Sequence, residues 1–185
     1  MSLDHAILGF LNYLPLSGYD LKKMFDTSVQ HFWPADQSQI YRTLGRLTGQ
    51  GFVGMEVFHQ EDHPDRKVYH ITSSGREHLE TWLKSMPSLE PNRSAALIQV
   101  FFCGRLSDDE ILAKFEAVAA IMRMVLDRYR QIPGQLEEYS HMVNSKRETY
   151  FWLLTLDLGL RTMRANLEWA ENVIGQIKNR QVPAE

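Results

Sequence analysis

A thirteen-residue stretch, 35–47, constrains the fold most. Asp36 within it is a candidate N-cap, with Gln39 three residues later at the spacing of a capping box. An apolar stripe at helical spacing follows, formed by Ile40, Leu44 and Leu47. At 3.6 residues per turn, the opposite side carries Ser38, Gln39, Arg42 and Arg46. The pattern predicts an amphipathic helix whose outer groups suit base edges and phosphates. An ordinary surface helix with solvated arginines is the alternative, and the neighbouring elements decide between the two.

Those neighbours have the order of a DNA-binding module. Apolar spacing predicts helices over 3–14 and 19–29, the second capped by Ser17 or Gly18. Residues 52–58 and 66–72 have strand character around the polar tip 59–65, which predicts a β-hairpin. A fourth helix restarts after Thr72, with Ser74 and Glu77 at capping-box spacing, and stops near Pro87.

Three helices, a hairpin and a closing helix are the order of a winged helix-turn-helix. In that fold the third helix enters the major groove and the hairpin flanks it. The expected class is therefore mainly α with a small β-hairpin. We expect a winged helix-turn-helix domain at 1–87 and a helical, coiled-coil-like dimerisation domain at 88–185.

Residues from about 4 to 85 resemble the PadR-like transcriptional regulators. The residues that carry the resemblance are 7–11 (ILGFL), 17–22 (SGYDLK), 38–47 (SQIYRTLGRL), 51–53 (GFV) and 67–76 (KVYHITSSGR). The rest of the chain resembles the helical C-terminal domain of the virulence-activator type. The resemblance implies a bacterial, homodimeric, operator-binding regulator, usually a repressor.

The C-terminal part reads as a linker and three helices. Pro91 marks the linker 88–92, and 93–102 reads as a short apolar helix. Ser107 and Glu110 open a long helix with a capping box, and Pro133-Gly134 is expected to close it.

The last helix carries two apolar strips. The first, which we name the seam, repeats at spacings of three and four, as in a coiled coil: Leu153, Leu156, Leu160, Met163, Leu167, Ala170, Ile174 and Ile177. The second, which we name the outer strip, comprises Phe151, Leu154, Leu158, Trp169 and Val173. One strip would pack on the 107–132 helix and the other on a second subunit. We expect the seam residues to take part in dimerisation.

These assignments predict how the protein binds double-stranded DNA. Three residues are candidates for base-edge contact: Ser38, Gln39 and Arg42. Gln37 joins them on the DNA-binding surface, and the phosphate candidates are Tyr41, Arg46, Lys22, Arg66 and Lys67. Two-fold symmetry predicts a pseudo-palindromic operator. The aromatics of loop 31–34 are expected to pack in the core or a dimer interface rather than to stack on bases.

An adaptor that binds proteins and not DNA is the alternative function. The formal net charge is -3, which argues against a generally basic nucleic-acid coat protein. Residues 1–86 contain more Asp and Glu than Lys and Arg, so DNA affinity would depend on few basic contacts.

Other kinds of site find little support. Three histidines, His59, His63 and His70, lie near Asp62 and Asp65, but their spacing matches no standard zinc pattern, so no metal is expected. We find no phosphate loop or catalytic triad motif, and expect neither an enzyme nor a cofactor. Trp152 and Trp169 are candidates for a pocket that takes a small aromatic or apolar effector, with packing as the alternative.

The sequence also bears on location. Cys103 is the only cysteine, so no intrachain disulfide is possible. The start lacks the pattern of a signal peptide, and no apolar run approaches the ~20 residues of a membrane span. We expect a cytoplasmic protein without membrane contact.

Overall fold

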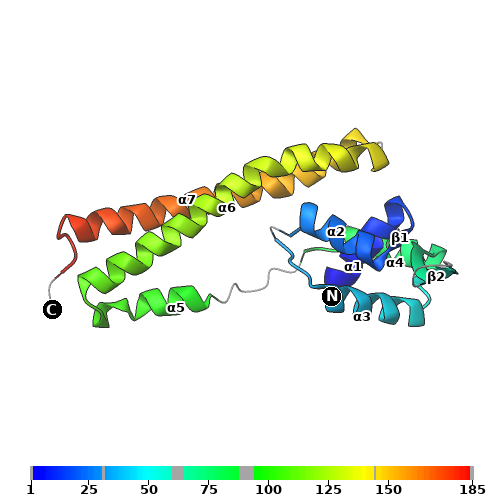
Figure 1. The fold of residues 1–185 in the computed structure, drawn as a ribbon, viewed down its shortest axis with the longest axis horizontal. Helices are drawn as coiled ribbons and strands as arrows, with labels where there is room; N and C mark the ends of the chain where they lie inside the picture. Colours follow the sequence, from blue (N-terminus) through cyan, green and yellow to red (C-terminus); the bar gives the residue numbers. More distant parts are fainter. Residues whose placement is uncertain (1, 31, 60–64, 88–93, 144, 184–185) are drawn as a thin grey trace. The chain divides into compact units, whose positions relative to one another are not determined.

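Figure 1 shows a mainly helical chain whose described strands belong to its N-terminal half. The structure is a computed structural model that describes residues 2–30, 32–59, 65–87, 94–143 and 145–183, apart from the side chains of residues 133–142. The chain separates into two compact units. The first unit joins Met1–Pro87 to Ile132–Trp152, and the second joins Ser88–Gln131 to Leu153–Glu185.

The N-terminal elements follow the predicted order. They are α1 (Ser2–Tyr13), β1 (Leu16–Ser17), α2 (Gly18–Thr27), α3 (Gln37–Gly49), β2 (Val53–Phe58), β3 (Arg66–Ile71) and α4 (Ser73–Lys84). The mainly helical class with a small hairpin is confirmed. Ser17 is the residue that caps α2, and it forms a capping box with Asp20.

The sheet contains one strand more than the sequence predicts. β2 and β3 pair antiparallel, with Val53 opposite Ile71 and Phe58 opposite Arg66. The short strand β1 pairs with the other edge of β3, so the order is β1-β3-β2. A two-residue strand is too short to give the alternating pattern that identifies strands in a sequence. Arg66 and Lys67 of the hairpin therefore lie on β3, the central strand of the sheet.

The sequence-based prediction of the α4 cap was wrong by two residues. Thr72, not Ser74, is the N-cap of α4, and its hydroxyl oxygen accepts a hydrogen bond from Gly75 N at 3.1 Å. The Ser74 hydroxyl instead donates to the carbonyl of Gly51 at 3.0 Å. Gly51 follows α3 with a φ of +76°, in the left-handed region that favours glycine, so the predicted helix stop is confirmed.

The C-terminal elements are α5 (Ala95–Phe101), a 3₁₀ turn (Cys103–Arg105), α6 (Asp108–Val143) and α7 (Lys146–Lys178). Among them, α6 is longer than expected and α5 is shorter. The expected linker 88–92 and Arg93 lie outside the described residues. The predicted capping box before α6 is confirmed, because Ser107 N donates to Glu110 Oε2 at 2.9 Å and Glu110 N donates to Ser107 Oγ at 3.4 Å.

Pro133 does not end α6, contrary to the sequence-based expectation. Proline removes one backbone N–H and crowds the preceding turn, at a cost of about 3 kcal/mol. That cost is local, and the hydrogen bonds of the turns on either side of residue 133 offset it in a helix of 36 residues.

Each unit has its own apolar core. In the first unit the fully or almost fully buried side chains come from α1, α2, α3 and β2: Ile7, Leu8, Leu21, Phe25, Ile40, Leu44, Leu47 and Val53. In the second unit Phe115 and Ala119 of α6 pack with Ala170 of α7. The apolar stripe of α3 thus anchors the helix on which the DNA-binding prediction rests.

Stacked rings join α1 to α4 in the first unit. His5 lies between Trp82, at 4.3 Å between ring centroids, and His78, at 5.2 Å. Phe52 extends the column on the far side of His78, at 4.5 Å. Near-parallel rings at these distances add dispersion attraction to the burial of apolar surface. The column fixes α4 behind the helices that carry the candidate site.

A second contact in the first unit joins α1 to the beginning of α7. The Tyr13 hydroxyl donates to Glu148 Oε2 at 2.8 Å, and the Tyr13 ring meets Trp152 edge-on at 5.7 Å. Burial and the hydrogen bond to the Glu148 carboxylate raise the pKa of Tyr13 to about 12.

Tyr13→Phe is expected to remove a stabilisation that depends on pH. The pKa of Tyr13 is higher in the folded chain than the value of about 10 for an unfolded tyrosine, so its contribution is complete below pH ~10. That contribution is lost as the pH rises toward the folded pKa of about 12. Urea unfolding at a series of pH values should show wild type and Tyr13→Phe converging over this range. A constant difference between them would contradict the assignment.

Candidate nucleic-acid interface

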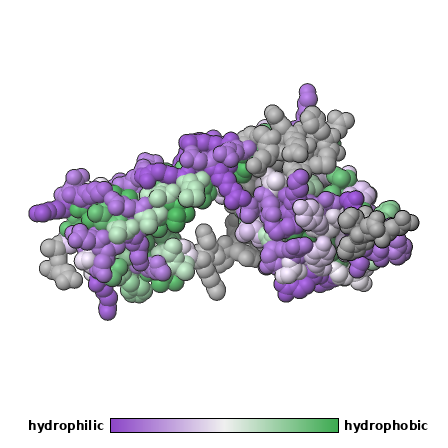
Figure 2. Space-filling model, viewed as in Figure 1, coloured by the Kyte–Doolittle hydropathy of each residue, from purple (hydrophilic) through white to green (hydrophobic). Residues whose placement is uncertain are grey.

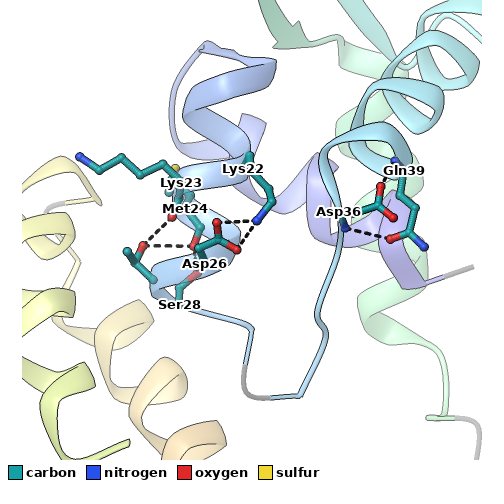
Figure 3. A network of polar contacts seen from close by, with 8 residues as sticks. Lys22, Lys23, Met24, Asp26, Ser28, Asp36 and Gln39 are labelled. Atoms are coloured by element: carbon teal, nitrogen blue, oxygen red, sulfur yellow. Dashed lines mark hydrogen bonds and ion pairs between the residues drawn. The ribbon is translucent and has the colours of Figure 1, made fainter. Parts of the chain in front are cut away.

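α3 begins with a reciprocal cap. The Asp36 carboxylate accepts from Gln39 N at 2.8 Å and from the Ser38 hydroxyl at 2.7 Å, while Gln39 Oε1 accepts from Asp36 N at 3.0 Å. Hydrogen bonds from the Ser38 side chain and from the backbone N–H of Gln39 hold the pKa of Asp36 below its usual value. Figure 3 shows that the side-chain amide nitrogen of Gln39 points away from the cap. The predicted capping box is confirmed.

The two faces of α3 are separated as the sequence predicts. Ile40 and Leu44 are fully buried and Leu47 almost so. The exposed side chains are Gln37, Ser38, Gln39, Tyr41, Arg42 and Arg46. All six are among the residues predicted to bind DNA, and α3 brings them onto one accessible surface.

Arg42 lies along its own helix. Its Nε donates to the Ser38 carbonyl at 3.3 Å, and its Nη2 lies 3.5 Å from Ser38 Oγ. Both distances are long for hydrogen bonds of a guanidinium group. The side chain therefore gives up little when it turns toward another acceptor.

Arg46 has a structural partner that the sequence does not indicate. Its two terminal nitrogens bind both carboxylate oxygens of Asp4 in α1, with 2.7 Å between Nη1 and Oδ2. Asp4 is 8% exposed, and its hydrogen bond raises the pKa of Arg46. A fork-to-fork pair of this kind orients α3 on α1. The role of Arg46 as a phosphate contact stays a prediction.

Two other predicted phosphate contacts are also paired with acids. Lys22 binds Asp26 one turn later in α2, as Figure 3 shows. Arg66 Nη2 donates to Asp20 Oδ2 at 3.0 Å and thereby joins the hairpin to α2. Burial works to raise the pKa of Asp20, but hydrogen bonds from Ser17 and Arg66 outweigh it and hold that pKa below its usual value.

A cleft of about 390 Å³ brings three predicted residues together beside the hairpin. Its lining is Ser17, Tyr19, Asp20, Tyr41, Asp65, Arg66 and Lys67. Tyr41, Arg66 and Lys67 were candidates from the sequence, whereas Tyr19 was not. The Tyr19 side chain is 68% exposed, and in the sequence Tyr19 belongs to the segment 17–22 that carries the family resemblance.

The seam of α7 is covered in part by its own chain. Leu156, Ala170 and Ile177 are buried, and in the second unit Ala170 packs with Phe115 and Ala119 of α6. The outer strip is more open: four of its five members, Phe151, Leu154, Leu158 and Trp169, are exposed. The participation of the seam in dimerisation stays a prediction.

The two tryptophans of the predicted effector pocket lie in different units. Trp152 contacts Tyr13 in the first unit, and Trp169 meets Phe115 edge-on at 5.4 Å in the second. Each packs within its own unit, which agrees with the packing alternative for these side chains.

The described part of the chain shows neither a metal site nor a membrane span. No group of three or more His, Cys, Asp or Glu residues could hold a metal ion there. His59 pairs with Asp65 at 3.0 Å, while Asp62 and His63 lie outside the described residues. None of the described helices is both long enough and apolar enough to cross a membrane.

Two family models match successive parts of the chain. The model of the transcriptional regulator PadR-like family matches residues 7–81. The model of the virulence activator alpha C-terminal region matches residues 92–178. The first match covers α3 and the hairpin, and the second covers the described C-terminal helices.

Full-length proteins are similar to the chain as well. The probable transcriptional regulator Rv1176c of Mycobacterium tuberculosis is 31% identical over 98% of this chain and 100% of its own length. Bacillus subtilis PadR in complex with operator DNA has a TM-score of 0.80 and 28% identity, covering 96% of this chain and 99% of that one. The Vibrio cholerae virulence activator AphA has a TM-score of 0.74 and 25% identity, with the same coverage. The winged-helix class is thereby confirmed, and the chain belongs to the PadR-like family of transcriptional regulators.

Proposed function

We propose that two copies of the chain form a dimer that binds a pseudo-palindromic operator and represses transcription. α3 enters the major groove in each half-site, and the β2–β3 hairpin lies beside it on the backbone. Residues 1–87 bind DNA, and residues 88–185 supply dimerisation and effector response. Repression is supported by Bacillus subtilis PadR, a negative transcriptional regulator that is 27% identical over 95% of this chain. A regulator of this kind acts in the bacterial cytoplasm, where the DNA is.

The proposal rests on the contrast between the buried and the exposed face of α3. Its apolar side is buried in the first unit, and its amide, hydroxyl and guanidinium groups are exposed on the other side. Arg42 and Gln39 have the donors that pair with guanine and adenine edges in the major groove. Ser38, Gln39 and Arg42 are the proposed base contacts, with Gln37 and the cations Lys22, Arg66 and Lys67 beside them.

Arg42→Ala is expected to weaken operator binding by about 1–3 kcal/mol, or roughly 5- to 150-fold, because a bidentate pair with guanine is lost. The variant should also discriminate less at the base that Arg42 reads. Fluorescence anisotropy with the operator and with single-base variants of it would measure both effects. The operator itself comes from selection of bound sequences from random duplex DNA. Unchanged affinity and unchanged discrimination would remove Arg42 from the proposed base contacts.

Lys67→Ala is the matched control for that experiment. Its side chain is exposed on the hairpin, where it would meet phosphate and no base. The loss should be similar for all sequences, with a salt slope shallower by about one unit. The two variants thus separate sequence reading from phosphate binding.

One observation favours the adaptor alternative. Three of the cations near the site are paired with acidic residues of the same unit: Arg46 with Asp4, Lys22 with Asp26 and Arg66 with Asp20. Pairing lowers the charge available to phosphates. A salt titration with random duplex DNA separates the functions, because a regulator loses affinity steeply with salt whereas an adaptor hardly binds.

Dimerisation is supported by apolar residues that a single chain leaves exposed. Figure 2 shows hydrophobic residues gathered on the second unit. Exposed members there include Leu97, Ile98, Phe101, Ile121, Met124, Leu158 and Trp169. Such a number of exposed large apolar side chains in one unit is typical of an interaction surface. A second copy of this chain is the proposed occupant.

A small aromatic or apolar effector is also part of the proposal. Its support is a relative: Bacillus subtilis PadR, 26% identical here with a TM-score of 0.72, has been solved in complex with p-coumaric acid. An effector that binds one arrangement of the dimer better than another would shift the separation of the two α3 helices.

A further inference from the structure

Two aromatic side chains flank the start of α3 on the surface. Phe32 is 53% exposed and Trp33 is 38% exposed, so neither is buried in the core of a single chain. Their packing in a dimer interface, the other expectation from the sequence, stays a prediction. Their position is held by the backbone: Phe32 N and Trp33 N both donate to the Val29 carbonyl, at 3.0 and 2.8 Å. Ala35, which follows Pro34, is buried and anchors the segment.

These aromatics form one wall of an open groove of about 590 Å³. The lining residues are Leu3, Phe32, Trp33, Pro34, Gln39, Arg42, Thr43 and Arg46. The apolar lining comes from the 32–34 segment and Leu3, and the polar lining comes from α3 and includes the proposed base contacts Gln39 and Arg42. A singly exposed tryptophan needs no explanation. A groove lined by both apolar residues and two proposed base-reading side chains suits a ligand with both kinds of surface.

Thymine has that combination in the major groove. It presents the O4 acceptor and, beside it, the C5-methyl group, whereas the other three bases offer only polar groups there. The cation available to the groove is Arg42, because Arg46 is held by Asp4. A positive, donor-bearing wall complements the acceptors of a duplex, and the indole excludes water from the methyl group.

We propose that the groove between Trp33 and the start of α3 holds the 5-methyl edge of a thymine in each operator half-site. Trp33 is then a specificity-determining residue outside the recognition helix. This inference rests on the proposed function, and it names one base that the protein selects. It assigns to the 32–34 segment the reading of a base beside those that Gln39 and Arg42 bind.

The test is a scan of the operator with deoxyuridine, which lacks only the methyl group. Full-length protein selects its operator from random duplex DNA, and each thymine is then replaced in turn, symmetrically in both half-sites. For wild type, one position should weaken binding about fourfold for each half-site, the value expected for one buried methyl group. Trp33→Ala should bind the thymine operator more weakly and should lose this sensitivity at the same position. Trp33→Phe keeps an apolar ring and should retain part of it.

The outcomes separate this inference from the function on which it rests. A wild-type scan with no methyl-sensitive position overturns the inference, even if Trp33→Ala fails to fold. Equal sensitivity in wild type and in Trp33→Ala, both folded by circular dichroism, also overturns it. In either case operator binding by α3 would stand. Failure of the wild-type protein to bind any duplex would overturn the proposed function, and the inference with it.

Discussion

Leu158→Glu is expected to convert the dimer to a monomer and to weaken binding to a two-half-site operator by about 10²–10⁴-fold. Leu158 is 66% exposed on the outer strip of α7 in a single chain, so the substitution leaves the fold of the chain intact. In the proposed dimer the same position is covered by the second copy. A carboxylate buried there without a partner opposes association strongly. Sedimentation velocity and operator titration would measure the two losses together.

The large loss in affinity follows from linkage of the two half-sites. Once one α3 is bound, a dimer presents the second at a high effective concentration, and a monomer does not. A duplex with a single half-site is therefore an internal test, since wild type and Leu158→Glu should bind it about equally. An unfolded variant would bind neither duplex.

Arg164→Gln is the matched control. It changes the net charge by the same amount and lies on an exposed part of α7 outside both apolar strips. It should remain dimeric and keep its operator affinity. A Leu158→Glu protein that stays dimeric would place the interface elsewhere, and the seam residues would then be the next to substitute.

The seam and the outer strip mark the limit of what periodicity predicts. Both have the spacing of a buried helix face, so the sequence indicates two partners for α7 but does not say which strip each one covers. In the structure Ala170 of the seam packs with Phe115 and Ala119 of the same chain. Which helix pairs with which depends on contacts far apart in the sequence, and local spacing does not encode them.

In the candidate site, too, some features were predictable from local sequence signals and others were not. The helix α3 was predictable because its signals are local: a cap three residues from its partner, and apolar residues one turn apart. The pairing of Arg46 with Asp4 was not predictable, because 42 residues separate them and other acids were equally available. The groove beside Trp33 was likewise not predictable from the sequence. It depends on how the 32–34 segment packs beside Leu3 and α3, which no short pattern indicates.

The cap of α4 shows a third kind of limit. Thr72 and Ser74 both carry hydroxyl groups near the helix start, and the capping-box spacing favoured Ser74. In the structure the Thr72 oxygen accepts from Gly75 N, while both hydroxyls donate to the carbonyl of Gly51, Thr72 at 2.7 Å and Ser74 at 3.0 Å. That carbonyl lies in the turn after α3, 21 residues before Thr72, so local spacing does not indicate the contact.

The same junction makes Gly75→Ala the substitution with the largest expected effect on stability. A Cβ at Gly75 would lie 2.2 Å from the backbone oxygen of Phe52 and 2.8 Å from Ile71 Cγ1. The Phe52 oxygen cannot retreat without loss, because it accepts a hydrogen bond from Thr72 N at 3.0 Å. Either α4 or the start of the hairpin must move, which should lower the free energy of unfolding by about 3 kcal/mol and the melting temperature by roughly 6–12 °C.

Gly9→Ala separates this steric effect from the general effect of alanine in a helix. A Cβ at Gly9 in α1 meets nothing within 4 Å, so the variant should be as stable as wild type or more stable by up to about 1 kcal/mol. Thermal unfolding followed by circular dichroism compares the two variants under one set of conditions. Equal stability of Gly75→Ala and Gly9→Ala would mean that the close approach of α4 to Phe52 is not a constraint. A selective loss in Gly75→Ala would show that the fold depends on the close packing of α4 against the backbone that leads into the hairpin beside α3.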